Sequence, residues 1–437
     1  MFNLKRFTLV VPFALAAASA FAQIERVSVA NDGSQAAGDS YQASISDDGQ
    51  VVAFRSNADG LAGGDSNGLP DIFVRDLGLG TTERISTEIG QNEQALYNRH
   101  SWTSISDDGM KVAYQATPSA FQTIRVFDRG DDSTVEILPL SPTPNNIDGE
   151  ARQQPVLSGN GQWVAFYSTV TFQGSEPPSA RPAPDDTNGA QDVFVYDLPT
   201  QQALRLSRNA DGVQGNAASL RPSISDEGRF VVFESWADNL VPDDIDVKKS
   251  DVFVKDRISS AIVQVSVSAA GVEADEDSEE AAISGDGNWI AFRSRAGNLV
   301  PGDTNGRWDI FVRDRSLTVI ERISVTSDGE QSNRDSFSPS LSDDGRFVAF
   351  HSSADNLVPD DANQRSDVFV HDRQTGLTAL VSRNGQGEPA DGHSTGATIS
   401  GDGQWLVFES DATDLVDGDT NRARDIFLAP NPLGADP

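Results

Sequence analysis

The sequence repeats one motif of oxygen-bearing side chains that could bind a metal ion. An aspartate is followed two residues later by asparagine, and a second aspartate stands four residues after that asparagine. The five complete copies are Asp65, Asn67 and Asp71; Asp186, Asn188 and Asp192; Asp303, Asn305 and Asp309; Asp361, Asn363 and Asp367; and Asp419, Asn421 and Asp425. Such oxygens can converge on Ca²⁺, which accepts about six to eight oxygen ligands in flexible geometry. The motif therefore predicts calcium-binding loops, with turn-building Asp and Asn as the alternative.

A longer copy of the motif consists of Asp244, Asp246 and Asp251. None of the copies is an EF-hand, which needs a further ligand inside the loop and a bidentate glutamate at its end. Calcium is the one cofactor that the sequence suggests. Because the motif recurs through most of the chain, its loops must be held by a repeating scaffold.

A second set of candidate ligand-binding residues stands just before predicted strands. Its members, at equivalent positions of the repeat, are Asp39, Asp277, Asp335 and His393. We expect them near a central channel, where a ring of acids could bind a cation. Trp102, Trp236 and Trp308 are expected on the same face, where an indole could stack on a sugar or anchor a protein. Solvated linkers and ordinary loop packing are the alternatives.

No residue is singled out as catalytic. The segment Gly392–Gly396 matches the Gly-x-Ser-x-Gly nucleophile elbow, but it precedes a predicted strand, whereas the elbow needs a strand-to-helix turn. Carboxylates are abundant, yet no pair stands apart from the repeating pattern, as a catalytic acid and base would. A binding protein is thus the leading interpretation, and a polysaccharide-active hydrolase or lyase with carboxylates at the channel mouth is the alternative.

The scaffold is revealed by the tetrapeptide Ser-[Asp/Gly]-[Asp/Glu/Asn]-Gly, which occurs seven times. Its glycines are Gly49, Gly109, Gly161, Gly228, Gly287, Gly345 and Gly403. Repeats of this length, each with several short strand-like segments, are typical of propellers and solenoids. The sequence therefore predicts one all-β repeat fold.

Each repeat contains four predicted strands, here called A to D. In the sixth repeat these are Pro339–Ser342, Arg346–Ser352, Asp367–Asp372 and Leu377–Ser382. Four antiparallel strands make one propeller blade. Strands B and C are apolar on both faces, which indicates that each sheet is sandwiched between two neighbours. The B–C loops and D–A linkers share one face of the ring, and the A–B and C–D turns share the other.

The two ends of the chain complete one blade. The last repeat stops after strand C, Asp425–Leu428, whereas Ile24–Ser28 at the other end matches the strand D segment Ile320–Ser324. Pairing the N-terminal strand with the last blade removes two open sheet edges. We therefore predict a seven-bladed β-propeller of four-stranded antiparallel blades over residues 23–430, closed by the N-terminal strand, with a C-terminal tail at 431–437.

The repeat resembles the TolB-type propeller repeat, a relative of the WD repeat. The similarity lies in Ser-Asp-Asp-Gly-Arg-Phe-Val-Ala-Phe, from Ser342, followed by Asp-Val-Phe-Val-His-Asp-Arg, from Asp367, and it extends over the whole mature chain. The resemblance implies the fold. TolB carries an additional α/β domain before its propeller, for which this chain has no room, so a role in the Tol system is not implied.

Residues 1–22 resemble a cleavable signal peptide, with Lys5 and Arg6, an apolar stretch, and the small-x-small pattern Ala20–Ala22. We therefore expect a periplasmic or secreted protein, without membrane insertion and monomeric. The 66 acidic residues against 33 basic ones give a net charge of −33, which disfavours nucleic acid as a partner. We expect a protein or a glycan to bind the face that carries the B–C loops.

Overall fold

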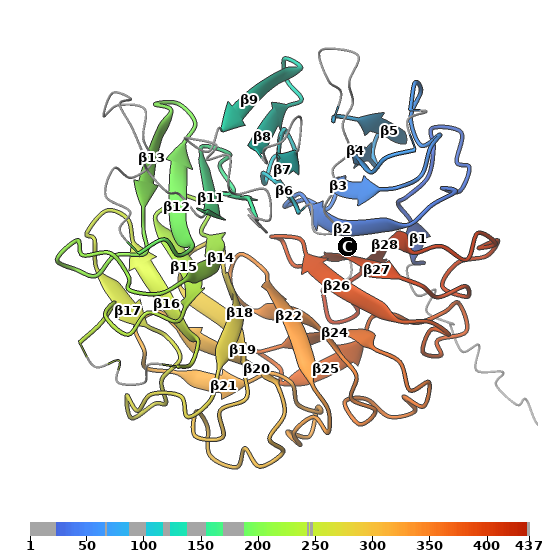
Figure 1. The fold of residues 1–437 in the computed structure, drawn as a ribbon. Coiled ribbons are helices and arrows are strands. Elements are labelled where there is room, and N and C mark those ends of the chain that lie inside the picture. Colours follow the sequence, from blue (N-terminus) through green and yellow to red (C-terminus); the bar gives the residue numbers. More distant parts are fainter. Residues whose placement is uncertain are drawn as a thin grey trace, which may run out of the picture.

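The computed structural model describes residues 23–65, 68–86, 102–116, 123–137, 154–168, 188–242, 244 and 248–434. Within these ranges every regular element is a β-strand, and no helix is long and apolar enough to cross a membrane. The strands form seven four-stranded antiparallel sheets, arranged as blades around one axis (Figure 1). The predicted seven-bladed propeller is therefore confirmed.

Each blade contains four strands, A to D, in the order in which they pair within the sheet. Strands A are β2 (Ser40–Ile45), β6 (Thr103–Ile105), β10 (Val156–Leu157), β14 (Ser219–Ile224), β18 (Ser278–Ile283), β22 (Ser336–Leu341) and β26 (Ser394–Ile399). Strands B are β3 (Val51–Ser56), β7 (Lys111–Ala116), β11 (Trp163–Ser168), β15 (Phe230–Ser235), β19 (Trp289–Ser294), β23 (Phe347–Ser352) and β27 (Trp405–Ser410). Strands C are β4 (Asp71–Asp76), β8 (Thr123–Asp128), β12 (Asp192–Asp197), β16 (Asp251–Asp256), β20 (Asp309–Asp314), β24 (Asp367–Asp372) and β28 (Asp425–Pro430). Strands D are β5 (Thr81–Arg84), β9 (Ser133–Ile137), β13 (Gln202–Arg205), β17 (Ile262–Gln264), β21 (Ile320–Arg322), β25 (Leu377–Leu380) and β1 (Glu25–Arg26).

The A strands line the axis and form an unbroken circle. Each strand A contacts the strand A of both neighbouring blades, and β26 of the last blade contacts β2 of the first. The A–B turns close a second circle, of seven backbone hydrogen bonds. The donor N–H and acceptor carbonyl pairs are Asp47 to Asp107, Asp107 to Gly159, Asn160 to Asp226, Asp226 to Gly285, Asp286 to Asp343, Asp343 to Gly401, and Asp402 to Asp47. The ring is thus closed at strands and at turns.

The hydrophobic core lies between the blades. Among the residues that the structure describes, seven apolar clusters occur, one for each pair of neighbouring blades. This agrees with the apolar character of strands B and C on both faces. Trp289 shows how tightly blades meet, because it packs against Gly345 in the next blade's turn. That glycine has a φ of 67°, and an added Cβ atom would lie 2.3 Å from the indole.

The N-terminal strand completes the last blade, as predicted. β1 pairs with β28 in antiparallel fashion, Glu25 opposite Leu428 and Arg26 opposite Phe427. Beyond the strand, the Val27 N–H donates to the carbonyl of Ile426 at 2.8 Å. Because Val27 is fully buried, the segment also contributes to the core between the last and first blades.

We predict that deletion of residues 23–30 abolishes cooperative folding. The deletion exposes the edge of β28 and removes the partner strand of the seventh blade. Differential scanning calorimetry of the deleted and parent mature chains tests this. A deleted chain that still melts in one sharp transition near the parent midpoint would show that closure is dispensable.

Candidate functional site

The first aspartate of strand C is the fixed point of each acidic loop. In six blades it is at most 5% exposed, and its Oδ1 accepts a hydrogen bond of 2.5 to 2.8 Å from a serine hydroxyl just after strand D. The six aspartates are Asp71, Asp192, Asp251, Asp309, Asp367 and Asp425. The same serine oxygen accepts the N–H of the residue after the aspartate. The serine therefore fixes Oδ1 of each aspartate, and Oδ2 faces the B–C loop, as in Asp309, where it accepts a hydrogen bond from Asn305.

In four blades an arginine of strand D lies beside these carboxylates. The N···O distances are 3.0 Å and 3.4 Å from Arg26 to Asp419 and Asp425, 3.6 Å and 3.3 Å from Arg84 to Asp65 and Asp71, 3.3 Å from Arg205 to Asp192, and 3.4 Å from Arg322 to Asp303. The guanidinium group is thus the cation that these loops already contain. Burial and the neighbouring Asp309 raise the pKa of Asp303 to about 6, and Arg322 opposes that rise.

The asparagine of the motif builds a turn. The Oδ1 of Asn305 accepts the N–H of Arg307 at 2.8 Å, and its Nδ2 donates to Asp309 at 2.7 Å and to the Ser332 carbonyl at 2.9 Å. Asn363 and Asn421 make the same three bonds. These amides present N–H donors to the aspartate, which favours turn-building in these blades. Asn67, Asp186 and Asp246 lie outside the described residues.

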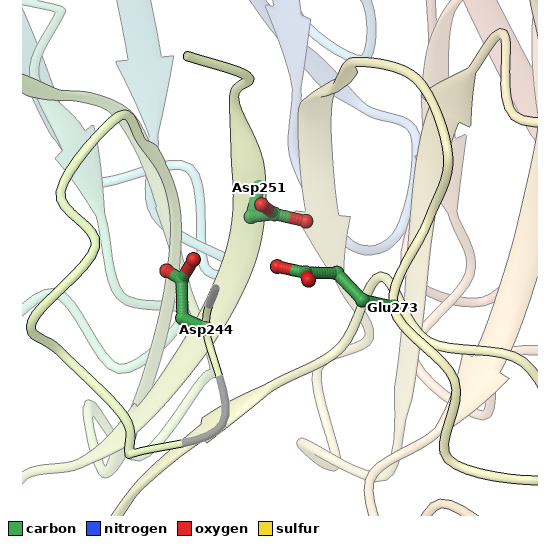
Figure 2. A group of neighbouring side chains, drawn as sticks. All are labelled: Asp244, Asp251 and Glu273. Atoms are coloured by element: carbon green, nitrogen blue, oxygen red, sulfur yellow. The ribbon is translucent and has the colours of Figure 1, made fainter. Parts of the chain in front are cut away.

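Blade four differs from the other blades. Gln264 occupies the arginine position of strand D, and Glu273 joins Asp244 and Asp251, so that one carboxylate oxygen of each lies within 4.8 Å of the others. Figure 2 shows the three carboxylates pointing toward one another, Asp251 from strand β16 and the other two from loops. This acidic triad could hold a metal ion. The sequence motif included both aspartates but missed Glu273, which stands where three other repeats have glutamine.

The predicted ring of acids at the channel mouth has a shared structural contact. Each side chain accepts, at 3.0 Å, the N–H of the residue that precedes strand C of the neighbouring blade. The acceptor and donor residues are Asp39 and Arg424, Asp277 and Ser250, Asp335 and Trp308, and His393 and Ser366. These residues therefore fasten adjacent blades together. Their binding of a ligand stays a prediction.

Trp308, which precedes strand β20, lies beside two arginines. The guanidinium carbons of Arg293 and Arg295 are 4.4 Å and 5.8 Å from the indole centroid, and Arg293 also lies 5.2 Å from the ring centroid of Phe337. The Nη2 of Arg293 donates a hydrogen bond of 2.7 Å to the Glu279 carboxylate. Blades five and six therefore contribute a half-buried group of aromatic and charged side chains, a composition typical of binding sites.

The A–B turns, on the opposite face of the ring, gather several carboxylates. Burial and neighbouring carboxylates raise the pKa of Asp107 to about 6, of Asp226 to about 8 and of Asp343 to about 7. Some of these turns contain glycine at positions where the carboxylates of neighbouring blades leave no space for a side chain. An added Cβ atom at Gly285 would lie 2.1 Å from Asp226 Oδ2 and 2.6 Å from Asp343 Oδ1.

This carboxylate cluster predicts that stability falls as the pH rises. Unfolded aspartates titrate near pH 4, so between about pH 4 and pH 8 the folded chain holds protons that the unfolded chain releases. The associated stability is fully present below pH 4 and is lost as the pH passes through the folded pKa values. Asp226→Asn should stabilise the protein at pH 8.5 by about 1–2 kcal/mol, a figure reduced for solvent screening.

Urea unfolding at pH 5 and pH 8.5 provides the measurement. Glu227→Gln is the matched control, since it removes the same charge from an exposed position of the same turn. Equal effects of the two substitutions at pH 8.5 would attribute the gain to net charge instead of to the cluster.

Comparison with known proteins identifies the fold. No family model matches the chain, and no curated protein matches its sequence. The chain is similar to an oligogalacturonate lyase in complex with manganese, at 14% identity and a TM-score of 0.55 over 95% of each chain. It is similar to the β-propeller domain of the Trilobed protease from Pyrococcus furiosus, at 11% identity and a TM-score of 0.52 over 92% of this chain and 99% of that one.

TolB from Acinetobacter baumannii also matches, at 13% identity and a TM-score of 0.40, over 71% of this chain. The chain spans 58% of the length of that TolB. Identities this low show the fold alone. The seven four-stranded blades and the match to the β-propeller domain of the Trilobed protease establish the β-propeller fold.

Proposed function

We propose that the chain is an exported, non-enzymatic binding propeller that presents its acidic loop-rich face to a protein or glycan. The group formed by Trp308, Arg293 and Phe337 at the channel mouth is the main support, because partly exposed tryptophan and arginine dominate the energy of many interfaces. A sugar could stack on the indole, and a protein could insert a side chain there.

The proposed location, partners, oligomeric state and metal ion rest on other observations. The predicted signal peptide supports a periplasmic or secreted location, and the net charge of −33 disfavours nucleic acid. We propose a monomer, because the ring closes on itself through β1 and β28. Calcium is proposed as the ion that orders part of the loop face, in blade four.

A polysaccharide-active hydrolase or lyase is the second candidate, favoured by Glu234. This glutamate is fully buried, and burial raises its pKa, while Arg221 opposes the rise from 3.1 Å away. Glu280 lies nearby, with its N–H 3.1 Å from Glu234 Oε2. Glu234 is buried and Glu280 is half-buried, so the two carboxylates lie in unlike surroundings, as a catalytic acid and base require. However, the hydrogen bonds of Glu234 also hold Glu280 at a φ of 52°, which is a structural role.

A binding screen of the mature chain against glycans and envelope proteins is the first experiment, with product assays for chain cleavage run in parallel. For any ligand found, we predict that Trp308→Ala weakens binding at least about tenfold, because truncating such an anchor costs about 2 kcal/mol or more. Isothermal titration calorimetry measures the change.

Trp102→Ala is the control, since Trp102 is 39% exposed and belongs to another blade of the same face. Unchanged affinity in Trp308→Ala, with loss in Trp102→Ala, would place the ligand over blade two and contradict the site at blade five. Cleavage of a screened glycan would favour the enzyme.

A further inference from the structure

In blades four and seven, the fifth residue of strand B contacts strand A of the next blade. The Oε2 of Glu409 accepts the N–H of Gln42, the third residue of β2, at 3.2 Å. Glu234 does the same for Glu280, the third residue of β18, at 3.1 Å. Both N–H groups belong to left-handed residues, with φ of 53° and 52°, at a shift in the strand register. A carboxylate of the preceding blade therefore serves as acceptor for this N–H.

Blade five keeps a carboxylate at this place although its strand B carries an arginine. Arg293 is the fifth residue of β19, and its Nη1 lies 3.4 Å from Oε1 of Glu280. The other oxygen of Glu280 accepts the N–H of Ser338, the third residue of β22, at 2.9 Å. The carboxylate of Glu280 thus lies between a guanidinium group and the N–H of the next blade, and it serves both.

Blade one has the same arginine without the carboxylate. Arg55 is the fifth residue of β3 and has the register of Arg293. Gln42 takes the position of Glu280. Within the part of the chain that the structure describes, the Arg55 guanidinium makes one hydrogen bond, of 3.3 Å to Asn57, and no ion pair with a carboxylate. The Nε of Arg55 and the Oε1 of Gln42 are buried atoms without a hydrogen-bond partner.

Burial makes the unpaired charge of Arg55 costly. The residue is 4% exposed, and burial lowers the pKa of its guanidinium group. The ring of Tyr41, with its centroid 5.5 Å from the guanidinium carbon, compensates for part of the lost hydration. Arg293, by contrast, has two carboxylate partners, Glu279 and Glu280. Arg55 is therefore a buried cation without the carboxylate that its counterpart in blade five has.

The strand A of blade two lies beside this arginine and glutamine. Thr103, the first residue of β6, donates its hydroxyl to the Gln42 carbonyl at 2.6 Å. Counted from the ladder pairs, Trp102 takes the position that Ser338 has in blade six. None of the hydrogen bonds of the described residues uses the backbone N–H of Trp102. The interface of blades one and two thus repeats the guanidinium group and the N–H of the interface of blades five and six, but not the carboxylate between them.

We propose that Arg55 binds the carboxylate of a ligand at the interface of blades one and two, in the place that Glu280 has at the interface of blades five and six. A guanidinium group binds a carboxylate through two parallel hydrogen bonds. Gln42 adds a donor, because a half-turn of its amide exchanges the oxygen for the N–H₂ group. A single negative charge suits the site better than a phosphate dianion, since the chain carries a net charge of −33.

This site goes beyond the proposed function, because it does not include the group around Trp308. Arg55 is one residue from the end of β3, where the B–C loop begins, and Trp102 is exposed. A ligand therefore reaches the site from the loop face.

The first experiment compares melting temperatures of the mature chain in about 50 mM sodium acetate, sodium glucuronate, sodium chloride and glucose, at a neutral pH where both acids are ionised. We expect acetate and glucuronate to raise the melting temperature by about 2 °C or more above its value in chloride. A rise with glucuronate alone would also support the site and would identify a uronic acid as the source of the carboxylate. No rise with either salt, or an equal rise with glucose, would overturn the proposal.

Exchange of single residues between blades gives the sharper test. Gln42→Glu rebuilds the arrangement of blade five within blade one, so this variant should melt above the parent in chloride and lose the response to the carboxylate salts. Arg55→Met should lose the response as well. Arg307→Met, which removes an exposed arginine of the same face, should keep it. A full response in both Gln42→Glu and Arg55→Met would show that the carboxylate binds elsewhere.

Two further variants separate this site from the other features of the mouth. Trp308→Ala should keep the response, so failure of the proposed function and failure of this site are distinguishable. Added to Gln42→Glu, Glu280→Gln removes the carboxylate of blade five and should restore a response there. A double variant that stays unresponsive while it remains folded would contradict the equivalence of the two interfaces on which the proposal rests.

Discussion

The need to neutralise a buried carboxylate organises the loop face of this propeller. The first aspartate of strand C is buried in six blades, each of which supplies hydrogen bonds to it, and in four of them an arginine of strand D lies beside the carboxylates of the loop. The serine after strand D, the arginine within strand D and the asparagine of the B–C loop meet this need together. Because these groups come from three segments, satisfying one carboxylate also fixes the loop, the strand and the linker to the next blade.

The fold could be predicted from the sequence because its determinants repeat. The Ser-x-x-Gly turn, the doubly apolar strands and the unmatched strand at each end define blades, stacking and closure, and the structure has all three. Strand ends were less predictable. In blade six, strand A extends from Ser336, upstream of the predicted start at Pro339, because the left-handed Ser338, with a φ of 50°, interrupts the apolar alternation without ending the strand.

The candidate site was only partly predictable, since its partners are separated in sequence. The aspartates were evident from their spacing, but the arginine that balances them lies on another strand, as Arg84 does for Asp71. The recurring Glu-Arg-Ile-Ser of strand D contained the missing information. Comparison of repeats at that position would have shown Gln264 and Leu380 as departures, and comparison of the linkers would have shown Glu273 and Pro389. Hydrogen bonds such as that from Trp308 to Asp335 are not visible in any local pattern.

In a ring of repeats, functional features are expected where one blade differs from the others. Two such differences are the acidic triad of blade four and the group around Trp308, and hydrogen bonds connect them. Ser250, next to Asp251 of the triad, donates its N–H to Asp277 at 3.0 Å and contacts Glu279 through its hydroxyl at 3.4 Å. Glu279 in turn bonds Arg293, which packs on Trp308. The acidic triad is therefore linked to the arginine beside Trp308 through the side chains of two residues, Ser250 and Glu279.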